Sequence, residues 1–230
     1  MYRRVLLKIS GEALSSEQSV ICGETVRSTA EKIKAIRTKG VQVGVVVGGG
    51  NILRGRSAEG MERNRADHMG MLATAVNSLA LQDALEQIGV PCVVQSAVEM
   101  ERFCDTYTSR SAKQALENGT VVIFACGSGC PFFSTDTAAA LRAAEIGADA
   151  LLLAKNIDAI YSGDPKTDQN AVRYSKISYD RVVKENLRAT DLTAITLCKE
   201  QKIPIRAFAL SQIVQVFEDD SIGTHIVEKE

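Results

Sequence analysis

Segments rich in glycine or polar residues stand at four points where an apolar strand is expected to end. The four segments are residues 8–11, 48–51, 127–129 and 155–158. Glycine lets backbone amides approach an anion closely, and Lys8 and Arg54 add fixed positive charge. Ligands of open parallel sheets bind beyond the carboxyl ends of the strands. These residues therefore predict a polyanionic ligand, most simply a nucleotide, along one edge of a sheet.

Each of these signals also has an explanation that needs no ligand. Residues 48–50 could form a tight turn between a strand and a helix, although ordering three consecutive glycines costs chain entropy. Lys8 could be a solvated lysine, and Arg54 could belong to an exposed basic face. The motif G-x-x-x-x-G-K-[ST] is absent, and Leu53 occupies the last position of a G-x-G-x-x-G motif that starts at Gly48. The sequence therefore disfavours a P-loop ATPase and a standard dinucleotide-binding dehydrogenase.

Composition narrows the class of protein further. The 230 residues include 27 Lys and Arg against 28 Asp and Glu, and 45% are hydrophobic. This balance is typical of a folded globular chain and argues against a dedicated nucleic-acid binder. No run of 18 apolar residues is present and the N-terminal apolar stretch is short, so we expect no membrane segment and a cytoplasmic protein. The six cysteines form no C-x-x-C pair, which favours reduced thiols over a metal site.

Apolar strands and amphipathic helices alternate along the chain. Strands are expected at 3–10, 41–47, 91–95, 120–125, 150–154, 205–208 and 224–227, and helices at 25–39, 67–88, 108–117, 136–146, 178–185, 191–201 and 211–217. Ser134 or Thr135 can cap the helix that starts at residue 136. This alternation predicts an α/β fold with a mostly parallel sheet covered on both faces. We expect one continuous domain, with a less independent part from about residue 127 as the alternative.

Five longer segments carry a resemblance to a known family. They are residues 8–14 (KISGEAL), 48–51 (GGGN) with Arg54 and Gly55, 66–74 (ADHMGMLAT), 131–136 (PFFSTD) and 158–165 (DAIYSGDP). In this order they resemble the bacterial uridylate kinases of the amino acid kinase superfamily, from about residue 3 to residue 227. The resemblance implies a three-layer α/β/α sandwich in a single domain, with the acceptor part mainly N-terminal and the ATP part mainly C-terminal.

The same resemblance implies an activity and an assembly. The expected reaction transfers the γ-phosphoryl group of ATP to UMP, giving UDP and ADP in pyrimidine nucleotide biosynthesis. Mg²⁺ is expected to be held through the ATP phosphates, with no metal ligand from the protein. The expected assembly is a homohexamer. Phosphoryl transfer needs alignment and charge neutralisation rather than a general base, which agrees with two histidines that have no partner in the sequence pattern.

Roles for single residues also follow from the resemblance. The expected catalytic residues are Lys8, Arg54 and Asp136, with Asp136 orienting the lysine. The residues expected to contact ATP are Lys8, Ile9, Ser10, Gly11, Gly50, Arg54, Asn156, Tyr161 and Asp164. The residues expected to contact UMP are Gly49, Asp67, Ser128, Gly129, Cys130, Pro131, Phe132, Phe133, Ser134 and Thr135.

Some alternatives stay open at the level of sequence. Asp67 begins the helix expected at 67–88, so it could be a helix cap instead of a ligand of the UMP ribose. The acceptor could be a carbamate, glutamate or aspartate on the same fold. A nucleotide-binding storage or sensor protein is a further alternative, but binding alone does not need Lys8, Arg54 and Asp136 together.

Three segments depart from the pattern of the uridylate kinases. Residues 15–20 (SSEQSV) lack the glycines of a loop that the family uses in activation by GTP. Cys130 stands beside the expected uridine site, where a polar residue is common. Residues 154–157 (AKNI) differ from one common form of the adenine loop, which leaves a shift of one residue open for Asn156.

Overall fold

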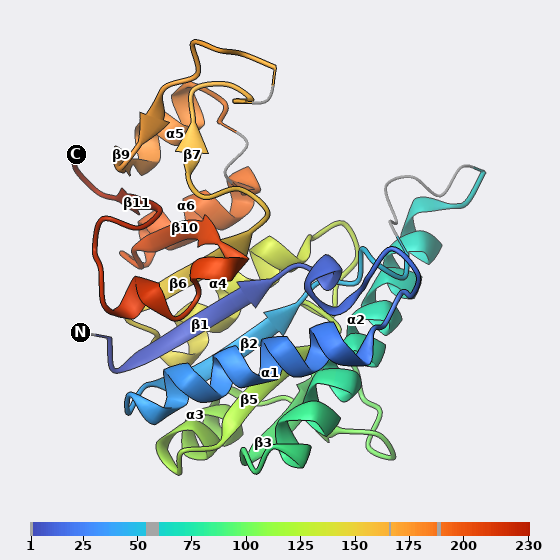
Figure 1. Cartoon of the computed structure of the whole chain (residues 1–230). Coiled ribbons are helices and arrows are strands. Elements are labelled where there is room, and N and C mark those ends of the chain that lie inside the picture. Colours follow the sequence, from blue (N-terminus) through green and yellow to red (C-terminus); the bar gives the residue numbers. More distant parts are fainter. Residues whose placement is uncertain (1, 54–59, 166, 188–189) are drawn as a thin grey trace.

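The computed structural model describes residues 2–53, 60–165, 167–187 and 190–230. Within these residues, nine strands form one sheet in the order β4-β3-β5-β2-β1-β6-β10-β11-β9, and β7 pairs with β8 in a small separate sheet (Figure 1). The strands of the large sheet are β1 (Arg4–Ile9), β2 (Gln42–Val47), β3 (Cys92–Ser96), β4 (Asp105–Thr106), β5 (Val121–Ala125), β6 (Ala150–Lys155), β9 (Lys176–Ser178), β10 (Ile205–Ala209) and β11 (Thr224–Val227). The small sheet consists of β7 (Ile160–Tyr161) and β8 (Arg173–Tyr174).

The central strands are parallel and buried on both faces. From β4 to β10 every neighbouring pair is parallel, and only the pairing of β10 with β11 is antiparallel. All five residues of β5 are buried, and their sequence VVIFA has no polar position. Continuous apolar runs of this kind are typical of parallel strands with helices on both sides.

Helices cover both faces of the sheet. They are α1 (Gly23–Thr38), α2 (Arg63–Gln87), α3 (Ser109–Glu117), α4 (Thr135–Ile146), α5 (Tyr179–Lys184) and α6 (Leu192–Glu200), with 3₁₀ turns η1 (Gly11–Leu14), η3 (Leu210–Gln212) and η4 (Gln215–Phe217). Val5 and Leu7 of β1 pack in one core with α1 and α2, while Leu6 packs in a second core with α3, α4, α5 and α6. Because side chains alternate along a strand, β1 contributes to both cores. The three-layer α/β/α architecture predicted from the sequence is confirmed.

Two predicted helices differ from the structure. The helix expected at 67–88 begins four residues earlier, at Arg63, because the Glu62 carboxylate accepts hydrogen bonds from the backbone amides of Asn64 and Arg65. The helix expected at 211–217 is instead two short 3₁₀ turns. Arg206, which is 1% exposed, donates hydrogen bonds to the carbonyls of Val216 and Asp219 at 2.6 Å, so these carbonyls are engaged outside a helix.

Four strands of two or three residues were not predicted. They are β4, β7, β8 and β9. Such short strands show no alternation that a sequence pattern could reveal. No helix in the described part of the chain has both the length and the apolar character that crossing a membrane requires.

Candidate functional site

The carboxyl ends of four adjacent strands meet at one edge of the sheet. Ile9 at the end of β1 pairs with Val47 of β2 and with Ala154 of β6, and Val46 of β2 pairs with Phe124 of β5. The four segments singled out in the sequence directly follow or include these strand ends. The structure therefore places them side by side, as expected for a ligand site of a parallel sheet.

Lys8 and Asp136 form an ion pair at this edge. The Nζ atom of Lys8 lies 2.6 Å from Oδ1 of Asp136, and the two side chains are 14% and 15% exposed. Asp136 lies in the first turn of α4, whose N-cap is Ser134; the Ser134 hydroxyl accepts hydrogen bonds from the amides of Asp136 and Thr137. The hydroxyl of Thr190 donates to Oδ2 of Asp136 at 2.7 Å. Both carboxylate oxygens are thus held, and Asp136 in turn holds the lysine.

Neighbouring charges keep Asp136 ionised. Burial by itself raises the pKa of this carboxyl, but the positive charges of Lys8 and Lys155 outweigh it and lower the pKa below its usual value. The pKa of Lys155, the last residue of β6, is also lowered, in this case mainly by burial. Burial and the like charge of Lys8 lower the pKa of the Lys155 ammonium, while the carboxylates of Asp136 and Asp191 raise it.

The sequence reasoning missed two members of this cluster, Lys155 and Thr190. Lys155 stands in a segment that the sequence did single out, at a strand end rich in polar residues. Its position one residue beyond the pairing of Ala154 with Ile9 could have indicated it. Thr190 comes from the chain between α5 and α6, and no pattern in the sequence connects it to Asp136.

Close packing explains two of the glycines. A Cβ atom on Gly11 would lie 2.0 Å from Oδ1 of Asn51 and 2.7 Å from the carbonyl oxygen of Gly48. A Cβ atom on Gly49 would lie 2.9 Å from both the Ala73 side chain and the Gly70 carbonyl of α2. Gly11 and Gly49 thus let η1, the turn after β2 and α2 approach one another closely. A tight turn at residues 48–50 is therefore compatible with a ligand site at the same edge.

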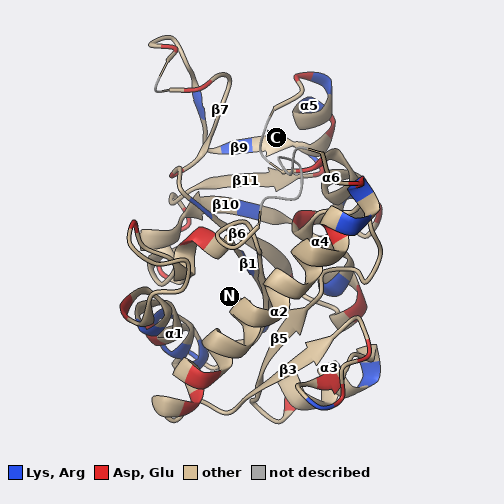
Figure 2. Ribbon diagram, turned by 90° about the vertical axis from the view of Figure 1, so that its right-hand side faces the viewer, with Lys and Arg blue, Asp and Glu red and all other residues tan. Residues whose placement is uncertain are grey.

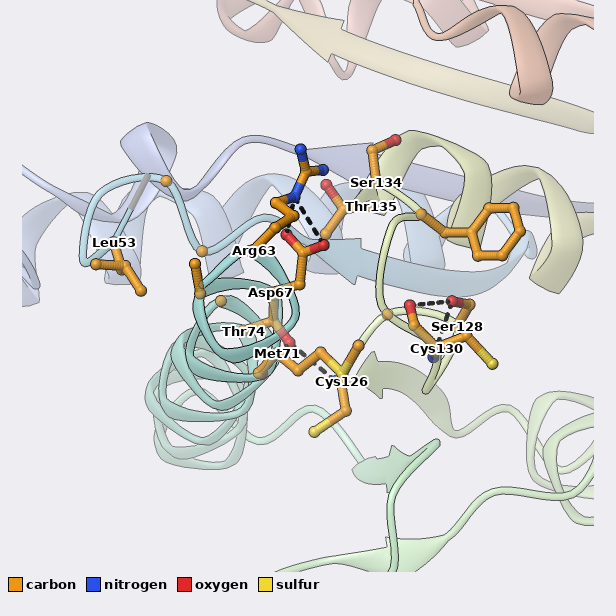
Figure 3. A pocket seen from close by; sticks show the side chains of 16 residues that line it. Leu53, Arg63, Asp67, Met71, Thr74, Cys126, Ser128, Cys130, Ser134 and Thr135 are labelled. Carbon is orange, nitrogen blue, oxygen red and sulfur yellow. Dashed lines mark hydrogen bonds and ion pairs between the residues drawn. The ribbon is translucent and has the colours of Figure 1, made fainter. Parts of the chain in front are cut away.

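A cavity of about 170 Å³ opens between α2, the glycine turn after β2 and the loop after β5 (Figure 3). Its lining includes the predicted residues Gly49, Gly50, Asp67, Ser128, Cys130, Phe133, Ser134 and Thr135. It also includes Gly127, from the segment 127–129 singled out in the sequence, and Leu53, Arg63, Ala66, Gly70, Met71, Thr74 and Cys126, which were not predicted. The predicted residues Gly129, Pro131 and Phe132 belong to the same loop but do not line the cavity.

Asp67 is not the cap of α2. It lies four residues inside the helix, and its carboxylate accepts hydrogen bonds from Nε of Arg63 and from the backbone amide of Phe132. The alternative that Asp67 caps the helix is therefore wrong, because Glu62 has that role. The ribose-binding role expected for Asp67 agrees with its place on the cavity wall.

Among the described residues expected to bind ATP, all except Gly50 lie outside the lining of this cavity. Ser10 precedes η1, the side chain of Ile9 is fully buried, and the Ile9 carbonyl accepts a hydrogen bond from the amide of Gly48 at 3.0 Å. The amide group of Asn156 donates to Oε2 of Glu12 at 2.7 Å, and the Tyr161 hydroxyl donates to Asp158 at 3.0 Å. Asp164 lies in the turn beyond β7, where its carbonyl accepts from the amide of Asp168.

Arg54, which was expected to be catalytic and to bind ATP, lies outside the described residues.

No cluster of three or more His, Cys, Asp or Glu side chains able to hold a metal ion occurs among the residues that the structure describes. Oδ1 of Asp136 forms the ion pair with Lys8, and Oδ2 accepts the hydrogen bond from Thr190.

This edge of the sheet combines the Lys8 ammonium, which Asp136 holds in place, with the exposed backbone of Gly50 in the turn after β2. Lys8 is fixed in direction by Asp136, and Lys155 places a second positive charge close by. Thr135 lines the cavity and directly precedes Asp136, so the cavity and the ion pair adjoin. A phosphorylated ligand in the cavity would meet preorganised positive charge, which is what phosphoryl transfer requires.

Comparisons with known proteins agree with this geometry. The model of the amino acid kinase family matches residues 3–208. Among solved structures, the UMP kinase of Bacillus anthracis is 33% identical with a TM-score of 0.95, covering 100% of this chain and 97% of that one. The UMP kinase of Ureaplasma parvum is 37% identical with a TM-score of 0.93, covering 99% and 100%. The uridylate kinase of Archaeoglobus fulgidus is 29% identical with a TM-score of 0.74, covering 97% and 99%. The Lys8–Asp136 edge and these full-length similarities lead to one conclusion: the chain belongs to the amino acid kinase family.

Proposed function

We propose that this chain is a UMP kinase, which transfers the γ-phosphoryl group of ATP to UMP and releases UDP and ADP. The observation that carries the proposal is the cavity between Asp67 and residues 128–135, which adjoins the Lys8–Asp136 ion pair. The similarity to two UMP kinases, at 33% and 37% identity over nearly the whole chain, supports the same activity.

Lys8 stabilises the charge that develops on the transferred group. Its ammonium is directed by Asp136, so it needs no reorganisation when the phosphoryl group moves. Arg54 contributes a guanidinium that can hold two phosphoryl oxygens, and the amides near Gly50 add dipoles. Lys155 adds a second, partly buried cation to this set. Mg²⁺ bound to the ATP phosphates supplies further neutralisation of charge.

The acceptor nucleotide occupies the cavity. Asp67 accepts hydrogen bonds from the ribose hydroxyls, and Gly49 brings its backbone to the phosphate of UMP. The loop from Ser128 to Thr135 surrounds the uridine. The exposed rings of Phe132 and Phe133 and the short side chain of Cys130 belong to this loop.

The donor nucleotide lies on the other side of Lys8. Its phosphates meet Ser10 and Gly11, and its adenosine part meets Asn156, Tyr161 and Asp164. The chain is then a single domain in which the acceptor part is mainly N-terminal and the ATP part mainly C-terminal. The hydrogen bond between Asn156 and Glu12 joins the loop after β6 to η1, so the segments proposed to meet the adenosine part and the phosphates lie together.

A coupled assay with ATP and Mg²⁺ tests the proposal. The acceptors UMP, CMP, dUMP, glutamate and carbamate are compared at equal concentration, and ADP formation is measured. We expect UMP to give the highest kcat/KM by a wide margin. Turnover of glutamate or carbamate without UMP would assign a different acceptor, and nucleotide binding without turnover of any acceptor would indicate a storage or sensor protein.

An apolar stripe on α2 supports assembly into a homohexamer. Met69, Leu72 and Val76 are 40%, 55% and 47% exposed, and α2 carries no charged residue between Asp67 and Asp83 (Figure 2). Exposed apolar patches of this kind mark contacts between proteins. Sedimentation of the parent chain and of Leu72→Glu tests the assembly.

We further propose that the enzyme acts in pyrimidine nucleotide biosynthesis in the cytoplasm, where its product UDP is formed from free UMP.

A further inference from the structure

Arg63 and Asp67 face each other across the first turns of α2. The Nε atom of Arg63 lies 3.0 Å from Oδ1 and 2.9 Å from Oδ2 of Asp67. The Arg63 side chain is 46% exposed, whereas that of Asp67 is 15% exposed, and both line the cavity (Figure 3). The guanidinium therefore sits at the mouth of the cavity and the carboxylate sits within its wall.

The Asp67 carboxylate also holds the loop on the opposite side of the cavity. Its Oδ2 atom accepts a hydrogen bond from the backbone amide of Phe132 at 2.8 Å. Phe132 has a φ of +71°, a backbone conformation that is unfavourable for a residue with a large side chain. The Arg63 guanidinium carbon lies 5.9 Å from the centre of the Phe132 ring. The start of α2 thus contacts residue 132 through both its backbone and its ring.

This arrangement links two parts of the cavity that UMP needs at once. A carboxylate that binds ribose hydroxyls must point in one direction, and a loop that surrounds a base must already have its shape for binding to be efficient. Arg63 satisfies the first need by its contact with both oxygens of Asp67. Asp67 satisfies the second by holding the Phe132 amide.

We infer that Arg63 is a positioning residue for the acceptor nucleotide. It orients the Asp67 carboxylate toward the ribose hydroxyls and, through Asp67, keeps the loop of residues 128–134 in its binding conformation before UMP arrives. The inference rests on the proposed function. The competing explanations are a helix-surface ion pair without effect on binding, and a direct contact between Arg63 and the nucleotide.

A double-mutant cycle on Arg63→Gln and Asp67→Asn separates these explanations. We expect Arg63→Gln to raise the KM for UMP about 10-fold, which is the effect of weakening one charge-assisted hydrogen bond. The kcat and the KM for ATP should stay within about two-fold of the parent, as expected for a loss of binding rather than of transition-state stabilisation. Because Arg63 acts through Asp67, the double variant should resemble Asp67→Asn alone. Arg63→Lys should be intermediate, since lysine keeps the charge without the planar guanidinium.

Arg65→Gln is the matched control. It removes the same charge two residues away, from an exposed side chain that does not line the cavity. It should leave both KM values unchanged. Hydrogen exchange of the segment around Phe132 gives a readout independent of activity: exchange should be faster in Arg63→Gln and in Asp67→Asn than in the parent, and unchanged in Arg65→Gln.

Each contrary result overturns a specific statement. An unchanged KM for UMP in Arg63→Gln leaves only a helix-surface ion pair. Effects that multiply in the double variant assign a direct contact with the nucleotide. If the parent itself does not phosphorylate UMP, the proposed function fails, whereas UMP turnover by the parent with an inert Arg63→Gln rejects only the role of Arg63.

Discussion

Lys8, at the end of the first strand, and Asp136, at the start of α4, meet at 2.6 Å although most of the N-terminal half of the chain separates them in sequence. The pair joins the sheet to the helix whose N-cap, Ser134, also lines the acceptor cavity. A change at either residue should therefore affect phosphoryl transfer directly and the local fold as well.

Replacing Lys8 by Met should lower kcat by roughly 10²–10³, the effect of removing one preorganised charge from a transition state. It should also lower Tm, because Asp136 is left largely buried without its ion-pair partner. The additional change Asp136→Asn should restore much of the Tm but none of the kcat. Lys176→Met, at an exposed position of β9, is the control and should match the parent. Near-normal turnover by Lys8→Met would remove Lys8 from the catalytic residues.

Replacing Thr190 by Val removes the hydroxyl that donates to Oδ2 of Asp136, with little change in shape. Hydrogen bonds to charged groups contribute about 1.5–3 kcal/mol, so we expect kcat to fall about 10-fold while both KM values change little. Thr196→Val removes a hydroxyl from the exposed side of α6 and should have no kinetic effect. Equal kinetics of the two variants would show that Asp136 does not depend on Thr190.

The lowered pKa of Lys155 predicts an alkaline limit to activity. The ammonium is charged below its pKa and loses its charge as the pH rises through it, at a pH below the usual value of 10.5 for lysine. Because kcat/KM reports the free enzyme, kcat/KM for ATP should decline over this range. Lys155→Arg should move the decline to higher pH, since arginine stays protonated. An identical pH profile in Lys155→Arg would exclude Lys155 as the titrating group.

Two glycine substitutions test the close packing at the sheet edge. Gly11→Ala should destabilise the fold by about 1–3 kcal/mol, because its Cβ would overlap Asn51 and the Gly48 carbonyl. For a chain of this size, that corresponds to a fall in Tm of roughly 2–4 °C for each kcal/mol. Gly23→Ala, at the start of α1 with no atom within 4 Å of the added Cβ, should leave Tm unchanged or raised. Thermal unfolding of the two variants side by side decides the matter, and equal Tm values would contradict the packing explanation.

The prediction for Arg54 depends on the sequence alone. Lysine in its place keeps the charge but cannot hold two phosphoryl oxygens with a planar fork, so Arg54→Lys should lower kcat by about 10². Arg65→Lys serves as the control on an exposed arginine. Parent-like turnover in Arg54→Lys would assign Arg54 to a solvated basic face.

The sequence by itself determined the layers of the fold and the edge where the site lies. Strands such as β2 and β5 are buried on both faces, so their continuous apolar runs are visible without a structure. The glycine segments follow these strands directly, and parallel strands bring their carboxyl ends together. This local information was sufficient to place Lys8, Gly49 and residues 127–129 at one edge.

Only the tertiary structure decided which side chains meet there. The contacts of Asp136 with Thr190 and of Asp67 with Phe132 join residues from elements far apart in the chain, and nothing in either segment encodes its partner. The pKa of Lys155 also depends on the tertiary structure. A lysine at a strand end has a shifted pKa only when it is buried and other charged groups pack around it. Such effects depend on distance in space, and distance in space is settled by packing rather than by local sequence pattern.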